Sequence, residues 1–310
     1  MPFQYNLGNI REYFSARYRA RPNYGPPALK EIAENCSDFM NWLKLGLPPE
    51  CQYLESAVAE MVHRHMVEFA ARREKSQQWE MDLEALTFTV PQGIKFTLDS
   101  LDPMIFSETF VYDIHFTEFD LTGKVVVEAG GFVGDTALYY AGKGATVYTL
   151  EPDPYNFRKL LRNLSLNSTL SKNIIPVNAA LGPDGSIEFP AGNGGGSSIY
   201  NHSESTAKVD SMSIDTLMEK YEIKNPYLLH LDVKGAEHDV LSGPGIGMFQ
   251  RVRVEYSPYL SIQGSMIGDY PDWIKSALAG MGFDRIRIFK HNDFRKTLSE
   301  HGTVDAMKTG

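Results

Sequence analysis

A glycine-rich segment with a carboxylate before it is the first place in this sequence where residue types and spacing indicate chemistry. Residues 128–135 read EAGGFVGD and follow an apolar run. Glycines let the backbone turn sharply and approach a ligand, and a helix beginning after Gly134 offers free N–H groups. A dinucleotide fingerprint needs glycine where Ala129 stands. Glu128 would repel a pyrophosphate, but it suits a ligand with a cationic amino-acid moiety, such as S-adenosylmethionine. A tight turn without a ligand is the alternative.

A second acid, Glu151, ends the next apolar run, a little over 20 residues after the glycines. An acid at this distance accepts hydrogen bonds from ribose hydroxyls, and Pro152 after it fixes the turn into the next helix. This spacing serves NAD and S-adenosylmethionine alike. Asn178 and Ala179 end the third run, where small residues would let an adenine ring lie flat; close helix packing explains them equally well.

The stretch 230–241, HLDVKGAEHDVL, places charged side chains in a run otherwise typical of a buried strand. His230, Asp232 and Lys234 alternate and share one face if the strand continues that far, and such violations of an apolar pattern indicate a site. We expect Asp232 to touch cofactor or substrate. Lys234 would stabilise a developing alkoxide, or act as a base if burial lowers its pKa. Glu237 is either a charge at a helix start or the group that orients Lys234.

Other polar residues give weaker signals. His202 and His230 are candidate bases, although a satisfied core histidine is the commoner fate of His230. Glu255 and Tyr256 end the fifth strand, where they either line a pocket or are ordinary strand-end residues. Asp232 and Glu255 could share a metal ion, but nothing in the spacing demands one. The glycine-serine loop 192–198 is a candidate to close over a substrate.

The elements that must position these residues alternate between strand and helix from residue 124 onward. Apolar runs predict strands, and three- and four-residue periodicity predicts helices. Strands are expected over 124–129, 146–151, 174–181, 227–234, 251–257 and 284–290, with a last edge strand over 303–308 and an extra hairpin over 186–190 and 209–214. Helices are expected over 134–144, 154–167, 215–223 and 271–283. This order predicts an α/β fold, with a mostly parallel sheet and helices on both faces.

The chain before residue 86 has a different character. Apolar residues at helical spacing over 28–47 and 53–86 predict a helical N-terminal region, residues 1–85, that caps the site or dimerises. An alternating pattern over 86–98 with a turn at 91–93 predicts a hairpin. We therefore expect a second domain over 86–310 with this hairpin at its entry.

Composition restricts the partners. The 310 residues carry a formal net charge of -9, so a global basic field for nucleic acid is absent. The two cysteines form neither a metal pattern nor a disulfide framework. The start has no apolar signal-peptide core, and no apolar run reaches the roughly 20 residues that span a bilayer. We expect a cytoplasmic protein without membrane contact.

Taken in order, these motifs resemble the FkbM-type methyltransferase family. The resemblance covers roughly residues 95–260 and rests on VVVEAGGFVGDT, VNAALG, the glycine-serine loop, SIDTLMEKY and LLHLDVKGAEHDVL. It implies a Rossmann-like class I methyltransferase that moves a methyl group from S-adenosylmethionine to a hydroxyl of a sugar or natural product. The family usually reads Asp-x-Gly-Ala-Asn-x-x-Gly and Lys-x-Asp-x-Glu-Gly-x-Glu. Here Glu128, Gly131 and Phe132 replace the first acid, the alanine and the asparagine, and His230 and Lys234 replace the first lysine and glutamate.

The sequence thus predicts S-adenosylmethionine as cofactor, a small hydroxyl compound as acceptor, no metal, and a homodimer through the N-terminal helices. The predicted catalytic residues are Asp232, Lys234 and Glu237. The predicted cofactor site consists of Glu128, Ala129, Gly130, Gly131, Phe132, Gly134, Asp135, Thr136, Glu151, Pro152, Asn178, Ala179 and Asp232. A non-catalytic S-adenosylmethionine-binding module stays open, because Lys234 alters the catalytic strand. An NAD-dependent oxidoreductase is disfavoured by Glu128, by Ala129 and by the lack of a Tyr-x-x-x-Lys pair.

Overall fold

The chain divides into two compact units, Met1–Thr117 and Glu118–Gly310. The structure, a computed structural model, describes residues 80–82, 84–102, 105–106, 109–110, 115, 117, 120–190, 206–256, 261–262, 265–266, 270–290 and 302–309. The predicted hairpin therefore belongs to the first unit, whereas the sequence suggested a boundary at residue 85. The helices predicted over 1–85, and the dimer expected through them, lie almost entirely outside the described residues.

The described part of the first unit is a small antiparallel sheet with an aromatic core. Its strands are β1 (Glu80–Asp82), β2 (Thr87–Thr89) and β3 (Lys95–Thr97), followed by the 3₁₀ helix η3 (Leu98–Ser100). The predicted hairpin is confirmed as β2 and β3. The helix predicted over residues 53–86 is wrong over 80–82, where β1 pairs with β2. Four buried phenylalanines pack with ring centroids 4.8–5.7 Å apart: Phe88, Phe96, Phe106 and Phe110.

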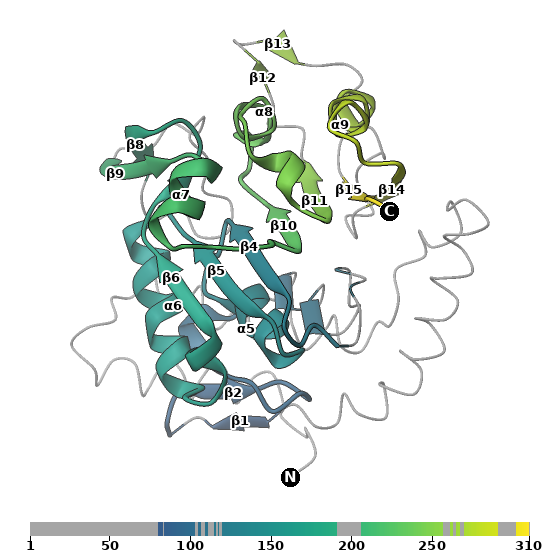
Figure 1. The fold of residues 1–310 in the computed structure, drawn as a ribbon. Helices are drawn as coiled ribbons and strands as arrows, with labels where there is room; N and C mark the ends of the chain where they lie inside the picture. Colours follow the sequence, from purple (N-terminus) through teal and green to yellow (C-terminus); the bar gives the residue numbers. More distant parts are fainter. Residues whose placement is uncertain are drawn as a thin grey trace. The chain divides into compact units, whose positions relative to one another are not determined.

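A seven-stranded sheet forms the centre of the second unit (Figure 1). Its strands, in spatial order, are β14 (Arg285–Lys290), β15 (Gly302–Met307), β11 (Arg251–Tyr256), β10 (Leu228–Leu231), β4 (Val125–Ala129), β5 (Thr146–Leu150) and β6 (Ile174–Val177). All run in one direction except β15, which is antiparallel to both neighbours. The predicted mostly parallel sheet is confirmed. The edge position expected for the last strand is wrong, since β15 lies between β11 and β14, in keeping with its buried residues Gly302–Ala306.

Helices pack on both faces of this sheet. They are α5 (Asp135–Gly142), α6 (Pro154–Leu166), α7 (Ile214–Lys220), α8 (Glu237–Leu241) and α9 (Tyr270–Gly280), with 3₁₀ turns η5 (Leu170–Asn173) and η7 (Ile246–Met248). The main apolar core lies on one face, where side chains of α7, α8 and α9 meet alternate residues of the strands, such as Val127, Leu229 and Val252. Tyr140 of α5 contacts His230, which points to the opposite face from Leu229. Among the described residues, no helix combines the length and apolar character needed to cross a membrane.

Local signals set where the helices begin. Asp153 accepts the Tyr155 N–H at 2.8 Å before α6, and Pro154 fills the first helical position. Ser213 caps α7 and is itself held by Asp184. The predicted extra hairpin is confirmed as β8 (Gly185–Pro190) and β9 (Thr206–Met212), with β7 (Ala180–Leu181) parallel to β9. A further pair is β12 (Ser261–Ile262) with β13 (Ser265–Met266).

Candidate functional site

The glycine-rich loop lies at the carboxyl end of β4, directly against the carboxyl end of β10. The N–H groups of Gly130 and Gly131 both donate to the Leu150 carbonyl, at 3.0 and 2.9 Å, and Asp232 N donates to Ala129 O at 2.9 Å. Gly130 has φ +93°, and a Cβ there would lie 2.0 Å from the Asp232 carbonyl oxygen. Only glycine fits this close backbone approach.

The turn continues through two further left-handed residues into α5. Phe132 has φ +43° and Gly134 φ +84°. Asparagine, which the family usually carries where Phe132 stands, tolerates such a backbone better than a bulky side chain does. Phe132 is held by its own N–H, which donates to Glu151 at 2.7 Å. Asp135 and Thr136 then begin α5, and both are buried.

Glu151 joins the glycine-rich loop to the turn after β5. Its Oε2 accepts the Phe132 N–H, and its Oε1 accepts the Asp153 N–H at 2.8 Å. Asn178 donates to the carbonyl oxygens of Glu151 and Pro152, at 2.7 and 3.2 Å. Burial raises the pKa of Glu151 to about 8, although the two N–H bonds oppose this. Glu151, the acid predicted to bind the ribose, therefore also acts as a latch: it holds the glycine-rich loop against the turn after β5.

Glu128 is a buried carboxylate without a full set of partners. Its side chain is 1% exposed, and among the described residues Oε2 has no hydrogen-bond partner. Burial raises the pKa of Glu128 well above its usual range, the nearby Thr149 hydroxyl opposes this, and the charges of Asp135, Asp232 and Glu151 add to it. Such a cluster of acids favours a positively charged ligand. The group of acids around Glu128 therefore fits the sulfonium and ammonium groups of S-adenosylmethionine.

Asp232 and Lys234 meet through a turn rather than along a strand. The sequence predicted that β10 continues to residue 234, but it ends at Leu231, so His230, Asp232 and Lys234 do not share a strand face. Lys234 has φ +45° and Gly235 φ +117°, which turns the chain back. Lys234 Nζ then lies 2.7 Å from Asp232 Oδ1 and 3.1 Å from Glu255 Oε1.

The protonation of Lys234 and Glu237 follows from these contacts. Burial alone lowers the pKa of Lys234, but Asp232 and Glu255 outweigh it, and the pKa lies well above its usual range. The condition under which Lys234 was expected to act as a base, a pKa lowered by burial, is therefore not met, and the two carboxylates favour its ammonium form. Burial raises the pKa of Glu237 to about 8. Its Oε2 accepts the Gly235 N–H at 2.9 Å, so Glu237 holds the turn that carries Lys234.

The other candidates separate into core and pocket. His230 is buried and its Nδ1 lies 3.3 Å from the Tyr140 hydroxyl; burial lowers its pKa to about 3, so it is a neutral core histidine. Glu255 reaches the site through Lys234, whereas Tyr256 packs in the apolar core. His202 and the loop 192–198 lie outside the described residues. Across the described ranges, no three His, Cys, Asp or Glu side chains gather as metal ligands.

The structure brings most of the predicted cofactor residues to one corner, where β4, β5 and β10 end. Ala129 and Ala179 are both buried, Ala129 at the end of β4 and Ala179 just after β6. Sequence reasoning missed Thr149, whose hydroxyl would lie 2.2 Å from a Cβ on Gly131. It also missed Tyr140, which has no sequence signal linking it to a histidine 90 residues away.

Solved structures with some similarity to this chain include several methyltransferases. Fibrillarin from Aeropyrum pernix, in complex with natively bound S-adenosyl-L-methionine, is 16% identical, with 60% of this chain and 67% of that chain covered and a TM-score of 0.36. TrmK from M. capricolum, in complex with S-adenosyl-homocysteine, is 10% identical, with 60% and 62% covered and a TM-score of 0.35. Precorrin-6y C5,15-methyltransferase from Geobacter metallireducens GS-15 is 10% identical, with 60% and 80% covered and a TM-score of 0.32. No curated protein matches the sequence.

One protein family matches the chain over more than half of its length. The profile described as the methyltransferase FkbM domain matches residues 127–302. This range contains the glycine-rich loop, Glu151 and the turn from Asp232 to Glu237. The fold is thus that of a Rossmann-like class I methyltransferase, and S-adenosylmethionine is the methyl donor. The chain belongs to the FkbM methyltransferase family.

Proposed function

We propose that this methyltransferase acts on an oxygen atom, the hydroxyl of a sugar or another small molecule. The observation that carries the proposal is the fixed ammonium group of Lys234, held by Asp232 and Glu255 beside the Gly130 loop. Asp232 is the most exposed of the three side chains, at 29%, so it is the one an acceptor can reach. The net charge of -9 favours a small acceptor over a nucleic acid.

Methyl transfer to a hydroxyl requires alignment of two atoms and help with one proton. When bound, S-adenosylmethionine supplies a methyl group made electrophilic by its sulfonium. Asp232 would accept a hydrogen bond from the acceptor hydroxyl and so orient the oxygen, and it would take up the hydroxyl proton, for release to solvent, as the oxygen–methyl bond forms and the methyl–sulfur bond breaks. Lys234, which keeps its proton, would stabilise the negative charge that develops on that oxygen. Glu237 contributes by holding the Gly235 turn.

The acids on the other side of the loop support a position for the cofactor. Glu128, with its unsatisfied oxygen, would face the cationic part of the ligand. Glu151 already accepts two backbone N–H bonds, but each carboxylate oxygen has a second lone pair, so it can still accept from ribose hydroxyls. Pro152 and Asn178 would border the adenine.

The test is transfer of a radiolabelled methyl group from S-adenosylmethionine to a panel of sugars, glycosides, phenols, amines and carboxylic acids. We expect an alkali-stable methyl ether as product. Asp232→Asn and Lys234→Met should lower kcat by about 10²–10³-fold while the Kd for S-adenosylhomocysteine changes only a few-fold, because they act on the acceptor side. An alkali-labile ester or a methylamine as product would refute oxygen methylation of a hydroxyl. Tight cofactor binding without transfer to any acceptor would favour the non-catalytic binding module.

A further inference from the structure

The charges that act on Glu128 are all of one sign. Within the described part of the chain they belong to Asp135 at the start of α5, Asp232 after β10 and Glu151 after β5, and no cation is among them. Thr149 on β5 contributes a hydroxyl rather than a charge. The Glu128 side chain is 1% exposed, and among the described residues its Oε2 has no hydrogen-bond partner. Ionisation of such a buried carboxyl costs free energy until a cation comes close.

His230 is the residue beside Glu128 on the neighbouring strand. The two are direct partners in the parallel pairing of β10 with β4, so their side chains stand on the same face of the sheet. A lysine at position 230 would therefore give Glu128 a counter-charge, whereas histidine can do so only when it is protonated. Burial, helped by the charge of Arg253, lowers the pKa of His230 to about 3, although the charge of Glu255 opposes this. His230 is thus neutral and leaves Glu128 without a counter-charge.

The next residue across the sheet is a buried cation that serves another acid. Arg253 is the direct partner of His230 in the pairing of β10 with β11, and of Asp305 in the pairing of β11 with β15. Arg253 Nη1 lies 4.0 Å from Asp305 Oδ1. The paired positions therefore form a row of acid, neutral histidine, cation and acid. In this row His230 separates Glu128 from Arg253 by two strand spacings, about 10 Å between backbones.

We infer that His230 sets the cofactor selectivity of this chain through Glu128: by leaving Glu128 without an internal counter-charge, it makes the chain bind S-adenosylmethionine more tightly than S-adenosylhomocysteine. The two ligands differ by one methyl group and by the positive charge of the sulfonium. In a buried site that charge is weakly screened, so it stabilises ionised Glu128 wherever in the corner the sulfur lies. Loss of the charge on methyl transfer then favours release of the product. The inference rests on the cofactor and not on the proposed acceptor.

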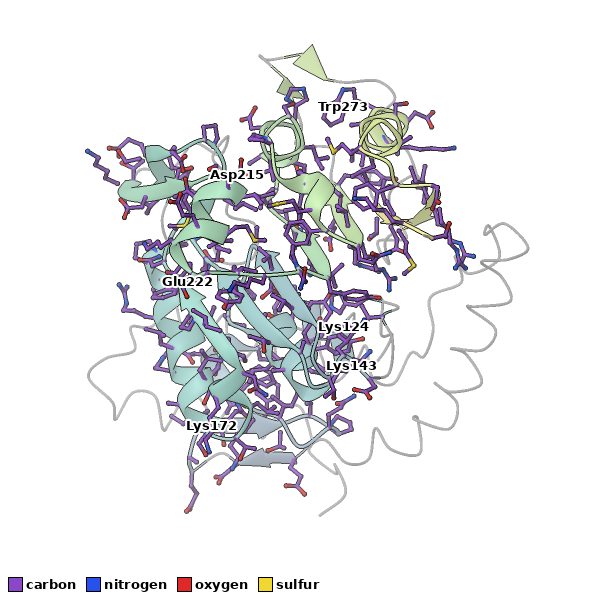
Figure 2. The ribbon with its side chains drawn as sticks, in the orientation of Figure 1. Lys124, Lys143, Lys172, Asp215, Glu222 and Trp273 are labelled. Atoms are coloured by element: carbon purple, nitrogen blue, oxygen red, sulfur yellow. The ribbon has the colours of Figure 1, made fainter. Side chains whose placement is uncertain are left out.

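Calorimetric titration of the full chain at pH 8 measures the Kd for S-adenosylhomocysteine divided by the Kd for S-adenosylmethionine. His230→Lys places a cation beside Glu128, and Glu128→Gln removes the acid. We expect each to lower this ratio at least about tenfold relative to the wild type. His230→Gln keeps the position neutral and should leave the ratio within about threefold. The matched control is Glu222→Gln, which removes an exposed carboxylate between α7 and β10 (Figure 2) and should leave the ratio unchanged.

Several results would overturn the inference. One is a wild-type chain that binds S-adenosylhomocysteine as tightly as S-adenosylmethionine, or binds neither. Another is an unchanged ratio in Glu128→Gln, when thermal unfolding shows that this variant is folded. A fall of the ratio in His230→Gln as large as in His230→Lys would mean that packing, and not charge, sets it. If His230→Lys does not fold, Glu128→Gln and His230→Gln still decide the matter. A wild-type ratio above one without methyl transfer to any acceptor would count against the proposed function alone.

Discussion

Replacing Glu151 with glutamine tests whether the latch at the end of β5 is also the cofactor's ribose acceptor. The two carboxylate oxygens each accept one backbone N–H, from Phe132 and Asp153, at 2.7 and 2.8 Å. A glutamine has only one carbonyl oxygen, so its amide NH₂ group must face the other N–H donor. The substitution keeps the size of the side chain but breaks one of the two bonds.

The magnitude depends on pH, because burial raises the pKa of Glu151 to about 8. At pH 9 the wild-type carboxyl is mostly ionised, and a hydrogen bond to a charged group contributes about 1.5–3 kcal/mol. The variant avoids burying a charge, which offsets part of that loss. We expect a net destabilisation of about 1–2 kcal/mol, which for a unit of this size lowers Tm by roughly 2–8 °C. Loss of a charged ribose acceptor should weaken cofactor binding by about 10–100-fold.

Calorimetric titration with S-adenosylhomocysteine at pH 6.5, 8 and 9 measures this effect. Wild-type affinity should rise with pH as Glu151 loses its proton, and the affinity of Glu151→Gln should change less with pH. Glu188→Gln, at an exposed position on β8, is the matched control and should behave as the wild type. Binding by Glu151→Gln within twofold of the wild type at pH 9 would refute the ribose role and leave only the latch.

Three further variants or conditions test other parts of the fold. Gly130→Ala should abolish cofactor binding and lower Tm by more than 5 °C, because its Cβ would overlap the Asp232 carbonyl. The control is Gly282→Ala, because Gly282 has φ +88° but no atom lies within 4 Å of its added Cβ. Thermal unfolding of this control should show only a small decrease in Tm. The folded pKa of Glu151 and Glu237 is about 8, above the unfolded value near 4.3, so their contribution is complete below pH 4.3 and is lost as pH rises to 8. Unfolding of the ligand-free chain should therefore show stability falling by on the order of 1 kcal/mol per pH unit for each group up to pH 8 and levelling above it; a flat profile would contradict the burial of these acids. Asp305→Asn should cost about 3–5 kcal/mol in urea unfolding, because it removes the negative charge that faces buried Arg251 and one of the two hydrogen bonds to it. A loss under 1 kcal/mol would mean that this pair contributes little.

The sequence predicted elements where a periodic pattern runs long enough to be distinctive. The six strands predicted between residues 124 and 290 became β4, β5, β6, β10, β11 and β14, and the amphipathic segments between them became helices. The sequence-based prediction failed where a strand forms by pairing with another strand rather than from its own local pattern. Helical spacing predicted a helix through residues 80–82, whereas β1 forms there as a strand that pairs with β2. The central place of β15 depends on hydrogen bonds to β11 and β14 that local patterns do not encode.

The site divides in the same way. The buried positions of the acids Glu128 and Glu151 agree with the sequence pattern, because each ends an apolar run, and their role toward the cofactor stays a prediction. The contact of Lys234 with Glu255 could not be predicted, because it depends on strand pairing and on left-handed torsions at 234 and 235. An expected continuous strand would have carried Lys234 Nζ along β10, whereas the turn brings it back to Asp232.

The two buried acids Glu237 and Glu128 differ in the groups that surround them. Glu237 uses one oxygen on Gly235 N and lies in the corner that already contains the Lys234 ammonium group. Glu128 lies on the cofactor side with a raised pKa and an unsatisfied oxygen. Its protonated form is therefore favoured in the ligand-free chain, whereas a cationic ligand favours its ionised form. Cofactor binding should then release a proton. Because ionised Glu128 is unfavourable without a counter-charge, a positively charged ligand should bind this site more tightly than a neutral one of the same shape.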